Sequence, residues 1–482
     1  MTVLLVNPYH NGKAEIPPLG LEYLASSLLS SGIAAAIADL DVPGGDNGHE
    51  YLLSQLRRYS PDIVGVTALS DSFKSARAVC RSIKDYSEGI LTVVGGIHPT
   101  FIGEPILEAC DEVDVVVRGE GEITFRELVA AHLQKKPLVT INGISFRDRG
   151  TIVTTGQRNL IKDLDALPLP AHDLVHNDIY RTRSISTSRG CFHSCTFCSI
   201  QSLYKRTLRL RSAESIVEEI EQLIGLGAQR IMFTDDNFTF SFQRVNHLCG
   251  EIMRRGYHTK VHFFAEGRID DVCKAPIMAQ IMSDAGFRGL YTGAESGSQE
   301  ILDFYEKKIT PEDVLRGVSC CIEQNLPPVV NFILCGPRDT HKTMLETIRL
   351  AKKIYENGAE IAYAEMLTPF PGTPIKDELE HDGKFRESDG VYYFHSYNGV
   401  DIERVLKLCT VARGMAYFVH GNDFLFSVKK PYFELSYLEE LLEGEVPSEF
   451  AALYERFPER GPERDMIDET YDNAKNLLRQ ER

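Results

Sequence analysis

Short apolar runs alternate with amphipathic helical segments along most of this chain, and the alternation limits the fold to the α/β class. Nearly continuous apolar strands joined by helices predict a parallel sheet with helices on both faces. Residues 1–140 are therefore expected to form a doubly wound, Rossmann-like domain. Its predicted strands are Val3–Asn7, Ala34–Asp39, Ile63–Thr67, Thr92–Gly95 and Val113–Val117, and its helical patterns include Leu19–Ser30, Ser72–Tyr86 and Glu122–Gln134.

A ligand site is expected at the carboxyl edge of this first sheet, because doubly wound domains bind ligands where the strand order reverses. The loops predicted at that edge span Pro8–Pro18, Ala68–Ser72, Gly95–Thr100 and Arg118–Glu122. Two glycine-containing turns side by side would let the backbone approach a bulky, flat ligand.

A second repeating region follows a connector, which we place at residues 141–180. Six β/α units between residues 181 and 375 predict a barrel or partial barrel with its active site at the carboxyl ends of the strands. The remaining residues, 376–482, have a helical pattern. The predicted strands of the barrel end near Ser188, Thr234, Glu266, Glu295, Gly336 and Pro369, and its helical patterns include Ser212–Leu226, Phe242–Arg255, Ala275–Ala285 and Thr343–Glu356.

Three cysteines follow the first barrel strand directly: Cys191, Cys195 and Cys198. Thiolates hold iron-sulfur clusters, and a 4Fe-4S cluster ligated fully by protein takes four of them. Three cysteines on one tight loop would leave one iron without a protein ligand. An open position on a metal is where chemistry takes place, as in catalytic zinc sites.

Other interpretations of the cysteine loop remain open at this point. A structural zinc site could recruit His193 as a fourth ligand, although such sites usually combine two separated cysteine pairs. A redox disulfide is a further alternative, whereas a ferredoxin-like carrier would need a fourth cysteine close by. The other eight cysteines lie singly or as the pair Cys320 and Cys321, which is typical of reduced core cysteines.

Polar residues also gather at later strand ends of the predicted barrel. The segment Thr234–Asn237 follows the second strand, Glu266–Arg268 the third and Gly293–Ser298 the fourth. Any one of these segments alone is more often a helix cap than a ligand. Such groups at four consecutive strand ends, counting the cysteine loop, favour one shared pocket.

The composition excludes some classes of function. The 482 residues suffice for two or three domains, and a formal charge of −17 makes duplex nucleic acid an improbable partner. A basic segment, Tyr204–Arg211, follows the cysteine loop and could serve an anionic cofactor or substrate. No signal-peptide pattern and no apolar run of about 18 residues occurs, so we expect a cytoplasmic protein without a membrane partner.

The cysteine spacing, together with Gly293–Ser298 and Thr368–Pro374, resembles the radical S-adenosylmethionine (SAM) superfamily. The first domain resembles the cobalamin-binding domain that precedes the radical core in one large subclass, through Pro17–Leu24, Gly95–Thr100 and Arg118–Glu122. Together the two resemblances cover roughly residues 1–375.

The resemblance implies three cofactors and the residues that bind them. Cys191, Cys195 and Cys198 would bind three irons of a 4Fe-4S cluster, and SAM would chelate the fourth iron. The residues at the family's SAM-binding positions are Phe197, Asp235, Asp236, Arg268, Glu295 and Ser296. Those expected to bind cobalamin are Pro18, Leu19, Gly20, Ser70, Gly95, Gly96, His98, Gly119 and Glu120.

The chain departs from one pattern of cobalamin domains. Residues 1–140 lack the Asp-x-His-x-x-Gly motif that supplies a histidine to cobalt in methionine-synthase-like domains. His98 is the natural rival, but it is more readily interpreted as a loop residue than as a cobalt ligand. The resemblance therefore implies a five-coordinate or water-ligated cobalt that faces the barrel.

The resemblance further implies the reaction and its partners. The expected activity is methylation of an unactivated carbon, or of phosphinate phosphorus, in a small-molecule biosynthetic intermediate through a 5'-deoxyadenosyl radical and methylcobalamin. A low-potential electron donor of the flavodoxin or ferredoxin type would reduce the cluster. Two alternatives remain: an enzyme of the same build that oxidises, cyclises or rearranges its substrate, and a cobalamin or cluster sensor without turnover.

Overall fold

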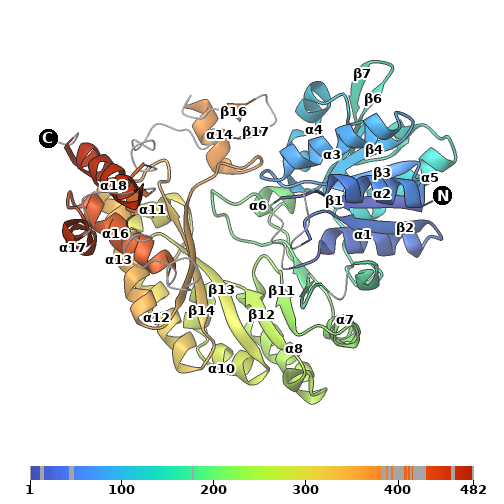
Figure 1. Cartoon of the computed structure of the whole chain (residues 1–482). Coiled ribbons are helices and arrows are strands. Elements are labelled where there is room, and N and C mark those ends of the chain that lie inside the picture. Colours follow the sequence, from blue (N-terminus) through green and yellow to red (C-terminus); the bar gives the residue numbers. More distant parts are fainter. Residues whose placement is uncertain are drawn as a thin grey trace.

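Two α/β sheets, one from each half of the chain, stand side by side, and a group of C-terminal helices lies beyond the second sheet (Figure 1). The predicted order of α/β domains is confirmed. The computed structural model describes residues 2–10, 16–42, 48–175, 179–382, 430–456 and 462–479, with short pieces at 387–388, 392–393, 407–409, 411–412 and 415.

The N-terminal sheet has seven strands in the order β2-β1-β3-β4-β5-β6-β7, and its first five strands are parallel. The order β2-β1-β3-β4-β5 is a doubly wound topology whose switch point lies between β1 and β3. The predicted strands are confirmed to within two residues at each end. The strands are β1 (Thr2–Asn7), β2 (Ala34–Asp39), β3 (Ile63–Thr67), β4 (Leu91–Gly95), β5 (Val115–Val117), β6 (Ile144–Asp148) and β7 (Thr151–Thr154).

Helices cover both faces of this sheet because its strands are apolar on both sides. On one face lie α1 (Leu19–Leu29) and α5 (Gly121–Leu133), which pack against Val3 and Leu5 of β1. On the other lie α2 (His49–Tyr59), α3 (Phe73–Tyr86) and α4 (Ile97–Ala109), which pack against Leu4 and Val6.

The segment predicted as a connector contributes to the first sheet. Its hairpin of β6 and β7 pairs antiparallel with β5, so the N-terminal sheet extends beyond residue 140. The remainder, about residues 155–180, runs across to the second sheet with a single 3-10 turn at His172–Leu174 among its described residues. The hairpin closes the sheet edge, and the later residues link the two sheets.

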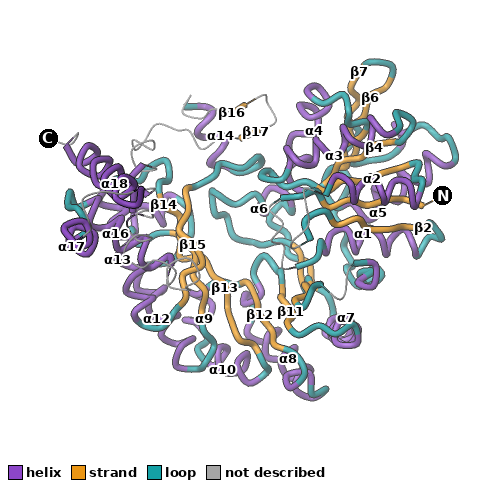
Figure 2. Tube along the Cα trace, in the orientation of Figure 1, coloured by secondary structure: helices purple, strands orange, loops and turns teal. Residues whose placement is uncertain are grey.

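The second sheet has six parallel strands in the order β15-β14-β13-β12-β11-β8, as the sequence predicts for a partial barrel (Figure 2). Its outer face packs against helices around a core that includes Phe233, Phe263 and Val330. The strands are β8 (Thr182–Ile185), β11 (Arg230–Phe233), β12 (His262–Glu266), β13 (Phe287–Glu295), β14 (Pro328–Leu334) and β15 (Glu360–Met366). The helices between them are α6 (Ile200–Leu203), α7 (Ala213–Gly225), α8 (Phe242–Arg254), α9 (Ile269–Lys274), α10 (Ile277–Asp284), α11 (Gln299–Phe304), α12 (Pro311–Glu323) and α13 (His341–Glu356).

The inner face of this second sheet is hollow. Residues that alternate with the core positions, such as Met232, Phe264 and Asn331, line a cavity there. A closed eight-stranded barrel fills its interior with layers of large side chains. Because six strands do not close, the inner face is left available for ligands.

The described part of the C-terminal region is mostly helical, as predicted, but it also contains a short antiparallel pair of strands, β16 (Glu387–Ser388) and β17 (Tyr392–Tyr393). Helix α16 (Lys430–Leu442) lies against α13, where Glu439 accepts ion pairs from Arg349 and Lys352 at 3.1 and 2.6 Å. The other helices are α14 (Pro374–His381), α17 (Ser448–Arg456) and α18 (Pro462–Arg479). Among all the described helices, none has the length and apolar character needed to cross a membrane.

Candidate active site

The cysteine loop begins at a sharp turn after β8. Residues Ser188–Arg189 form a short strand, β9, which pairs antiparallel with β10 (Arg209–Leu210). Gly190 follows with a φ of +94°, and a Cβ there would lie 2.0 Å from the carbonyl oxygen of Thr207. Glycine is therefore required for the chain to enter the loop at this angle.

The loop is anchored to three other parts of the chain. The side-chain amide of Gln201 donates to the Cys195 carbonyl at 2.7 Å. The amide of Thr196 donates to the Tyr305 carbonyl at 3.0 Å, and its own carbonyl accepts from the amide of Ile375 at 3.1 Å. These bonds fix the backbone between the cysteines against the fourth and sixth β/α units.

All three cysteines line one cavity of about 630 Å³ on the inner face of the second sheet, which we call the barrel cavity. Each of them has a free thiol. Within the described residues, no three His, Cys, Asp or Glu side chains converge as ligands of a single metal ion. This part of the chain thus forms neither a disulfide nor a one-ion zinc site at the loop.

His193, considered as an alternative fourth ligand, also lines the barrel cavity. Burial and the nearby Arg268 guanidinium lower its pKa to about 4, so the imidazole is neutral near pH 7. Burial likewise raises the pKa of the Cys198 thiol to about 12 and raises that of Cys191. A bound cation would be needed to hold these sulfurs as thiolates.

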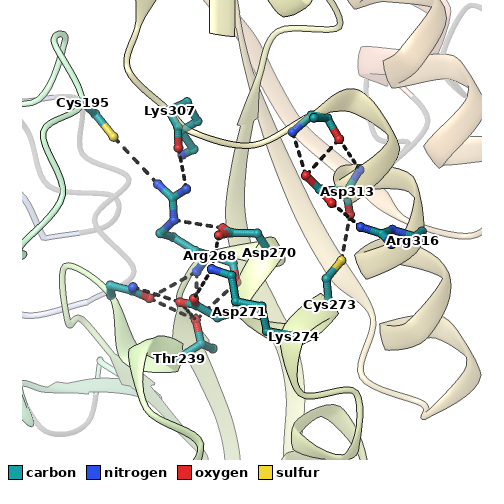
Figure 3. Close-up of polar contacts among 12 residues, drawn as sticks. Cys195, Thr239, Arg268, Asp270, Asp271, Cys273, Lys274, Lys307, Asp313 and Arg316 are labelled. Carbon is teal, nitrogen blue, oxygen red and sulfur yellow. Dashed lines mark hydrogen bonds and ion pairs between the residues drawn. The ribbon is translucent and has the colours of Figure 1, made fainter. Parts of the chain in front are cut away.

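Arg268 is the centre of a polar network below the cysteine loop (Figure 3). Its Nε lies 2.9 Å from Asp270, one terminal nitrogen donates to the Lys307 carbonyl at 2.6 Å, and the other faces the Cys195 sulfur at 3.9 Å. Asp270 is itself paired with Lys274 at 2.7 Å. Arg268, which the sequence predicts as a SAM-binding residue, therefore also places its guanidinium near the sulfur of the cysteine loop.

Lys307 is a cavity residue that sequence reasoning missed. Its ammonium donates to Glu295 at 2.7 Å and lies 5.9 Å from the centre of the Phe197 ring. Lys307, Glu295 and Phe197 all line the barrel cavity. No motif marks Lys307, because it lies in the loop after α11 and reaches the site through the fold.

Two carboxylates on neighbouring strand ends face the barrel cavity. Asp236 accepts a hydrogen bond from the Gly190 amide at 2.8 Å, and burial raises its pKa to about 6. Burial and the charge of Asp236 raise the pKa of Glu266 to about 7. Glu266, one of the polar strand ends seen in the sequence, lines the same cavity as the three cysteines.

Two predicted SAM-binding residues do not reach the barrel cavity. Asp235 is fully buried behind the loop, where it accepts hydrogen bonds from Thr187 at 2.7 Å and from Ser188. Ser296 is buried against the Thr347 hydroxyl at 2.9 Å. Successive side chains at the end of a strand point to opposite faces. Asp235 and Ser296 therefore point away from the cavity and stabilise the loops whose adjacent residues line it.

A second cavity, of about 570 Å³, lies between the two sheets, and we call it the interdomain cavity. It opens at the carboxyl edge of the first sheet, where the strand order predicts a ligand. Much of its wall is glycine backbone, which carries no side chain. A flat ligand can therefore approach the backbone closely. The glycines on the wall are Gly20, Gly65, Gly95, Gly96, Gly119 and Gly121.

Six of the nine residues predicted to bind cobalamin line this cavity: Leu19, Gly20, Gly95, Gly96, Gly119 and Glu120. Pro18, Ser70 and His98 are not on its wall. The segment Gly95–Thr100, predicted as a loop, turns into helix α4 at Ile97 and carries His98 into the core. There the His98 ring is 1% exposed and its Nδ1 is hydrogen-bonded to the Ser70 hydroxyl at 2.8 Å.

Arg189 joins the cysteine loop to the N-terminal domain. Its two terminal nitrogens pair with Glu120 at 2.9 Å and with Glu122 at 2.6 Å, and its guanidinium lies 5.0 Å from the centre of the Tyr23 ring. Arg209 adds a second ion pair to Glu120 at 2.8 Å. These buried pairs line or border the interdomain cavity and fix its position relative to the cysteines.

The two cavities share Ile200 and Asp236 as lining residues. The barrel cavity combines three thiols with carboxylates, three cations and the Phe197 ring, a donor set that suits an iron-sulfur cluster and a zwitterion with an aromatic group. The interdomain cavity combines glycine backbone with apolar side chains, which suits a large planar ligand. A molecule at the shared boundary would contact both ligands.

Comparison with known families places each domain. The B12 binding domain family matches residues 10–129, and the Radical SAM superfamily matches residues 185–351. An uncharacterized methyltransferase of Pyrococcus horikoshii is 33% identical over 367 residues, which cover 74% of this chain and 77% of that protein.

Two further proteins resemble nearly the whole chain. The anaerobic magnesium-protoporphyrin IX monomethyl ester cyclase of Cereibacter sphaeroides is 30% identical over 450 residues, which cover 90% of this chain and 71% of the cyclase. The solved structure of OxsB, a cobalamin-dependent S-adenosylmethionine radical enzyme with aqua-cobalamin bound, has a TM-score of 0.77 at 18% identity. That match covers 99% of this chain and 79% of the OxsB chain and shows a shared fold.

Proposed function

Because this chain belongs to the family of enzymes that join a B12 binding domain to a radical SAM domain, we propose that it methylates a small-molecule biosynthetic intermediate. The acceptor is an unactivated carbon or a phosphinate phosphorus. The enzyme uses a 4Fe-4S cluster, SAM and cobalamin. When bound, the cluster and SAM supply the radical that removes hydrogen from the substrate, and cobalamin supplies the methyl group.

The observation that carries this proposal is the meeting of the two cavities at Asp236 and Ile200. A substrate bound at this boundary contacts the ligands of both cavities at once. The substrate atom that loses hydrogen therefore need not move before it is methylated. The glycine-rich wall on one side and the thiol-lined wall on the other support the assignment of one cofactor to each cavity.

In the barrel cavity, Cys191, Cys195 and Cys198 are the proposed iron ligands. The charges around them suit the methionine part of SAM: Asp236 for its ammonium group and Lys307 for its carboxylate. The aromatic ring of Phe197 supports adenine. Lys307 is already paired with Glu295, so it presents its charge in a fixed position.

In the interdomain cavity, the backbone at Gly95, Gly96 and Gly119 approaches cobalamin, with Leu19 and Glu120 beside it. The apolar walls exclude water from the boundary between the cavities. Tyr23 is held by the Arg189 guanidinium and forms part of the same wall. The chain thereby orients the ligands and keeps the reacting region dry.

Anaerobic purification and reconstitution of the full chain tests this function directly. We expect about four irons and one cobalamin per chain. With a chemical reductant and SAM, mass spectrometry should detect both 5'-deoxyadenosine and S-adenosylhomocysteine. If S-adenosylhomocysteine is absent, methyl transfer is excluded, and if both products are absent the protein is a sensor without turnover.

A matched pair of cysteine variants controls this experiment. Cys198→Ala should lose the iron and both products, because a cluster site would then keep two protein ligands. Cys320→Ala changes a partly exposed cysteine on α12 and should retain them. Equal iron content in the two variants would contradict the assignment of the cluster to this loop.

A second candidate function is oxidation or cyclisation without methyl transfer. The relevant observation is that the cyclase of Cereibacter sphaeroides matches 90% of this chain, more than the methyltransferase of Pyrococcus horikoshii matches. Such an enzyme would yield 5'-deoxyadenosine without S-adenosylhomocysteine. The product analysis above therefore separates the two functions in one measurement.

A further inference from the structure

Arg268 directs one arm of its guanidinium toward the sulfur of Cys195 (Figure 3). Its Nη1 lies 3.9 Å from the Cys195 Sγ, a long hydrogen bond to a weak acceptor. The other two nitrogens already have partners: Nε is paired with Asp270 at 2.9 Å, and Nη2 donates to the Lys307 carbonyl at 2.6 Å. Among the described residues, the sulfur is the only partner of Nη1.

The backbone of Arg268 is fixed as well as its side chain. Its amide donates to the Thr239 hydroxyl at 2.9 Å and to the side-chain oxygen of Asn237 at 3.3 Å. The preceding residue, Gly267, packs so closely that a Cβ there would lie 2.6 Å from the Thr239 hydroxyl oxygen. The guanidinium is therefore held beside the cysteine loop by contacts within the chain.

The contact between Arg268 and Cys195 is shielded from solvent. Arg268 is 6% exposed and Cys195 is 8% exposed, so water screens the charge only weakly. Asp270 is also paired with Lys274 at 2.7 Å, so one carboxylate is shared between two cations. The positive charge of Arg268 is therefore only partly offset on the side away from the sulfur.

A positive N–H donor at this position affects the two oxidation states of a cluster unequally. When a cluster gains an electron, its sulfur ligands become more negative, so the donor stabilises the reduced state more than the oxidised state. Hydrogen bonds to the sulfurs and net charge are among the factors that set the potential of a cluster. We propose that Arg268 is a positioning residue that raises the reduction potential of the cluster by acting on the Cys195 sulfur.

This inference rests on the proposed cluster at the three cysteines. In the step that the potential governs, a low-potential donor loses one electron and the cluster gains that electron. No proton moves, and no covalent bond forms or breaks. A higher potential makes this transfer more favourable, so Arg268 would make the cluster easier to reduce.

The proposed role differs from the SAM contact that the family resemblance predicts for Arg268. Arg268 does line the barrel cavity, where SAM is proposed to bind. Arginine binds a carboxylate most strongly through two parallel N–H bonds from different nitrogens. Here each of the three nitrogens already has a partner within the chain, and the Lys307 ammonium lies in the same cavity to meet a carboxylate.

Four variants of the reconstituted full chain test the proposal. Arg268→Gln removes the charge, and Arg268→Lys keeps the charge but lacks the planar fork that reaches three partners. Asp270→Asn keeps an oxygen acceptor for Nε and removes the negative charge that offsets Arg268. The matched control is Arg316→Gln, because Arg316 is exposed on α12, pairs with Asp313 and does not line the barrel cavity (Figure 3).

The readout is the midpoint potential of the cluster in protein without SAM. The potential is set by electrochemical titration, and the electron paramagnetic resonance signal of the reduced cluster is followed. We expect Arg268→Gln to make reduction about tenfold less favourable, a decrease of about 59 mV for a one-electron couple. Arg268→Lys should show a smaller decrease, Asp270→Asn an increase, and Arg316→Gln no change. A purely structural role would not shift the potential in opposite directions in the two partners of one ion pair.

Several results would overturn the inference. An unchanged potential in Arg268→Gln would do so, and so would an equal shift in Arg316→Gln. If Arg268→Gln keeps the potential but loses affinity for SAM in a calorimetric titration, Arg268 is a SAM ligand and does not tune the cluster.

Two further outcomes separate this inference from the proposed function. If Arg268→Gln fails to retain a cluster, the opposite shifts expected of Arg268→Lys and Asp270→Asn still decide the question. If the wild-type protein itself binds no iron, the proposed function fails. A wild-type protein with its full iron content and variants with unshifted potentials would refute only the role of Arg268.

Discussion

The ammonium of Lys307 lies 2.7 Å from a carboxylate oxygen of Glu295, and this buried pair forms part of the barrel cavity. Glu295 ends β13 with a φ of +64°, a conformation that turns its side chain back over Gly293. A Cβ at position 293 would lie 1.9 Å from the same carboxylate oxygen. The position of the ion pair therefore depends on the absence of a side chain at Gly293.

Gly293→Ala should displace the Glu295 carboxylate and disturb Lys307 without removing any charge. We expect the affinity for SAM to fall about tenfold, which corresponds to about 1.4 kcal/mol of binding free energy. Calorimetric titration of the reconstituted protein with SAM measures this change. Unaltered affinity would show that the pair does not contact SAM.

Gly250→Ala is the matched control for that substitution. Gly250 lies within α8, where a Cβ would meet no atom within 4 Å. Alanine in a helix is more stable than glycine by about 0.5–1 kcal/mol, so this variant should unfold at slightly higher urea and bind SAM normally. If Gly293→Ala and Gly250→Ala lose SAM affinity equally, the loss reflects a change in protein stability and not the displacement of Glu295.

The fold could be predicted from the sequence because its signals are local. The strands of the first sheet are short apolar runs, and the helices between them have a clear 3.6-residue period. The topological position of both sites follows from general rules for parallel sheets. The spacing of Cys191, Cys195 and Cys198 predicts a cluster site, and the fold places all three cysteines on one cavity wall.

Some features of the two sites could not be predicted because they arise from tertiary contacts. Lys307 lies in a loop without a motif and becomes a cavity residue through its pairing with Glu295. His98 adjoins the glycines of the interdomain cavity in sequence, but the start of α4 buries its ring. The point at which α4 begins therefore decides whether His98 faces the cavity or the core.

Arg189→Met should destabilise the protein, because it leaves the buried Glu122 carboxylate without its cation. Arg209 still pairs with Glu120, so the main loss is at Glu122. Removing one partner of a buried ion pair costs about 3–5 kcal/mol. Urea denaturation measures the free energy of unfolding, and we also expect less bound cobalamin after reconstitution.

The double variant Arg189→Met with Glu122→Gln separates the ion pair from the packing of the two side chains. Once the carboxylate is removed, the loss of Arg189 should cost much less, with a coupling of about 1–3 kcal/mol between the two sites. Additive effects of the two substitutions would show that the pair makes no specific contribution at this interface.

Stability should decrease at alkaline pH because His172 lies between Glu22 of α1 and Glu219 of α7, at 2.5 and 3.0 Å. Burial alone would lower its pKa, but the two carboxylates raise it from 6.5 to about 9. Stabilisation from the protonated ring is therefore complete below about pH 6.5 and is lost as the pH rises through about 9. The contribution is on the order of 3 kcal/mol.

Urea denaturation at pH 6, 7.5 and 9.5 checks this dependence, with His172→Gln as the comparison. Glutamine cannot take a charge, so the variant should lack the alkaline loss that the wild-type protein shows. Asp236 and Glu266 titrate near pH 6 and 7 in both proteins, and their effects cancel in the difference. A parallel pH profile for the two proteins would rule out the role of His172.

Bound cobalamin should have no protein ligand on its cobalt. Among the described residues that line the interdomain cavity, none is His, Cys, Met or Lys. His98 is directed into the core, where its Nδ1 is hydrogen-bonded to Ser70 at 2.8 Å. The electron paramagnetic resonance spectrum of bound cob(II)alamin should therefore be the same in the wild-type protein and in His98→Gln. If the wild-type spectrum shows nitrogen splitting that His98→Gln removes, the ring must leave the core to bind cobalt, because a coordinating imidazole cannot remain in its present position.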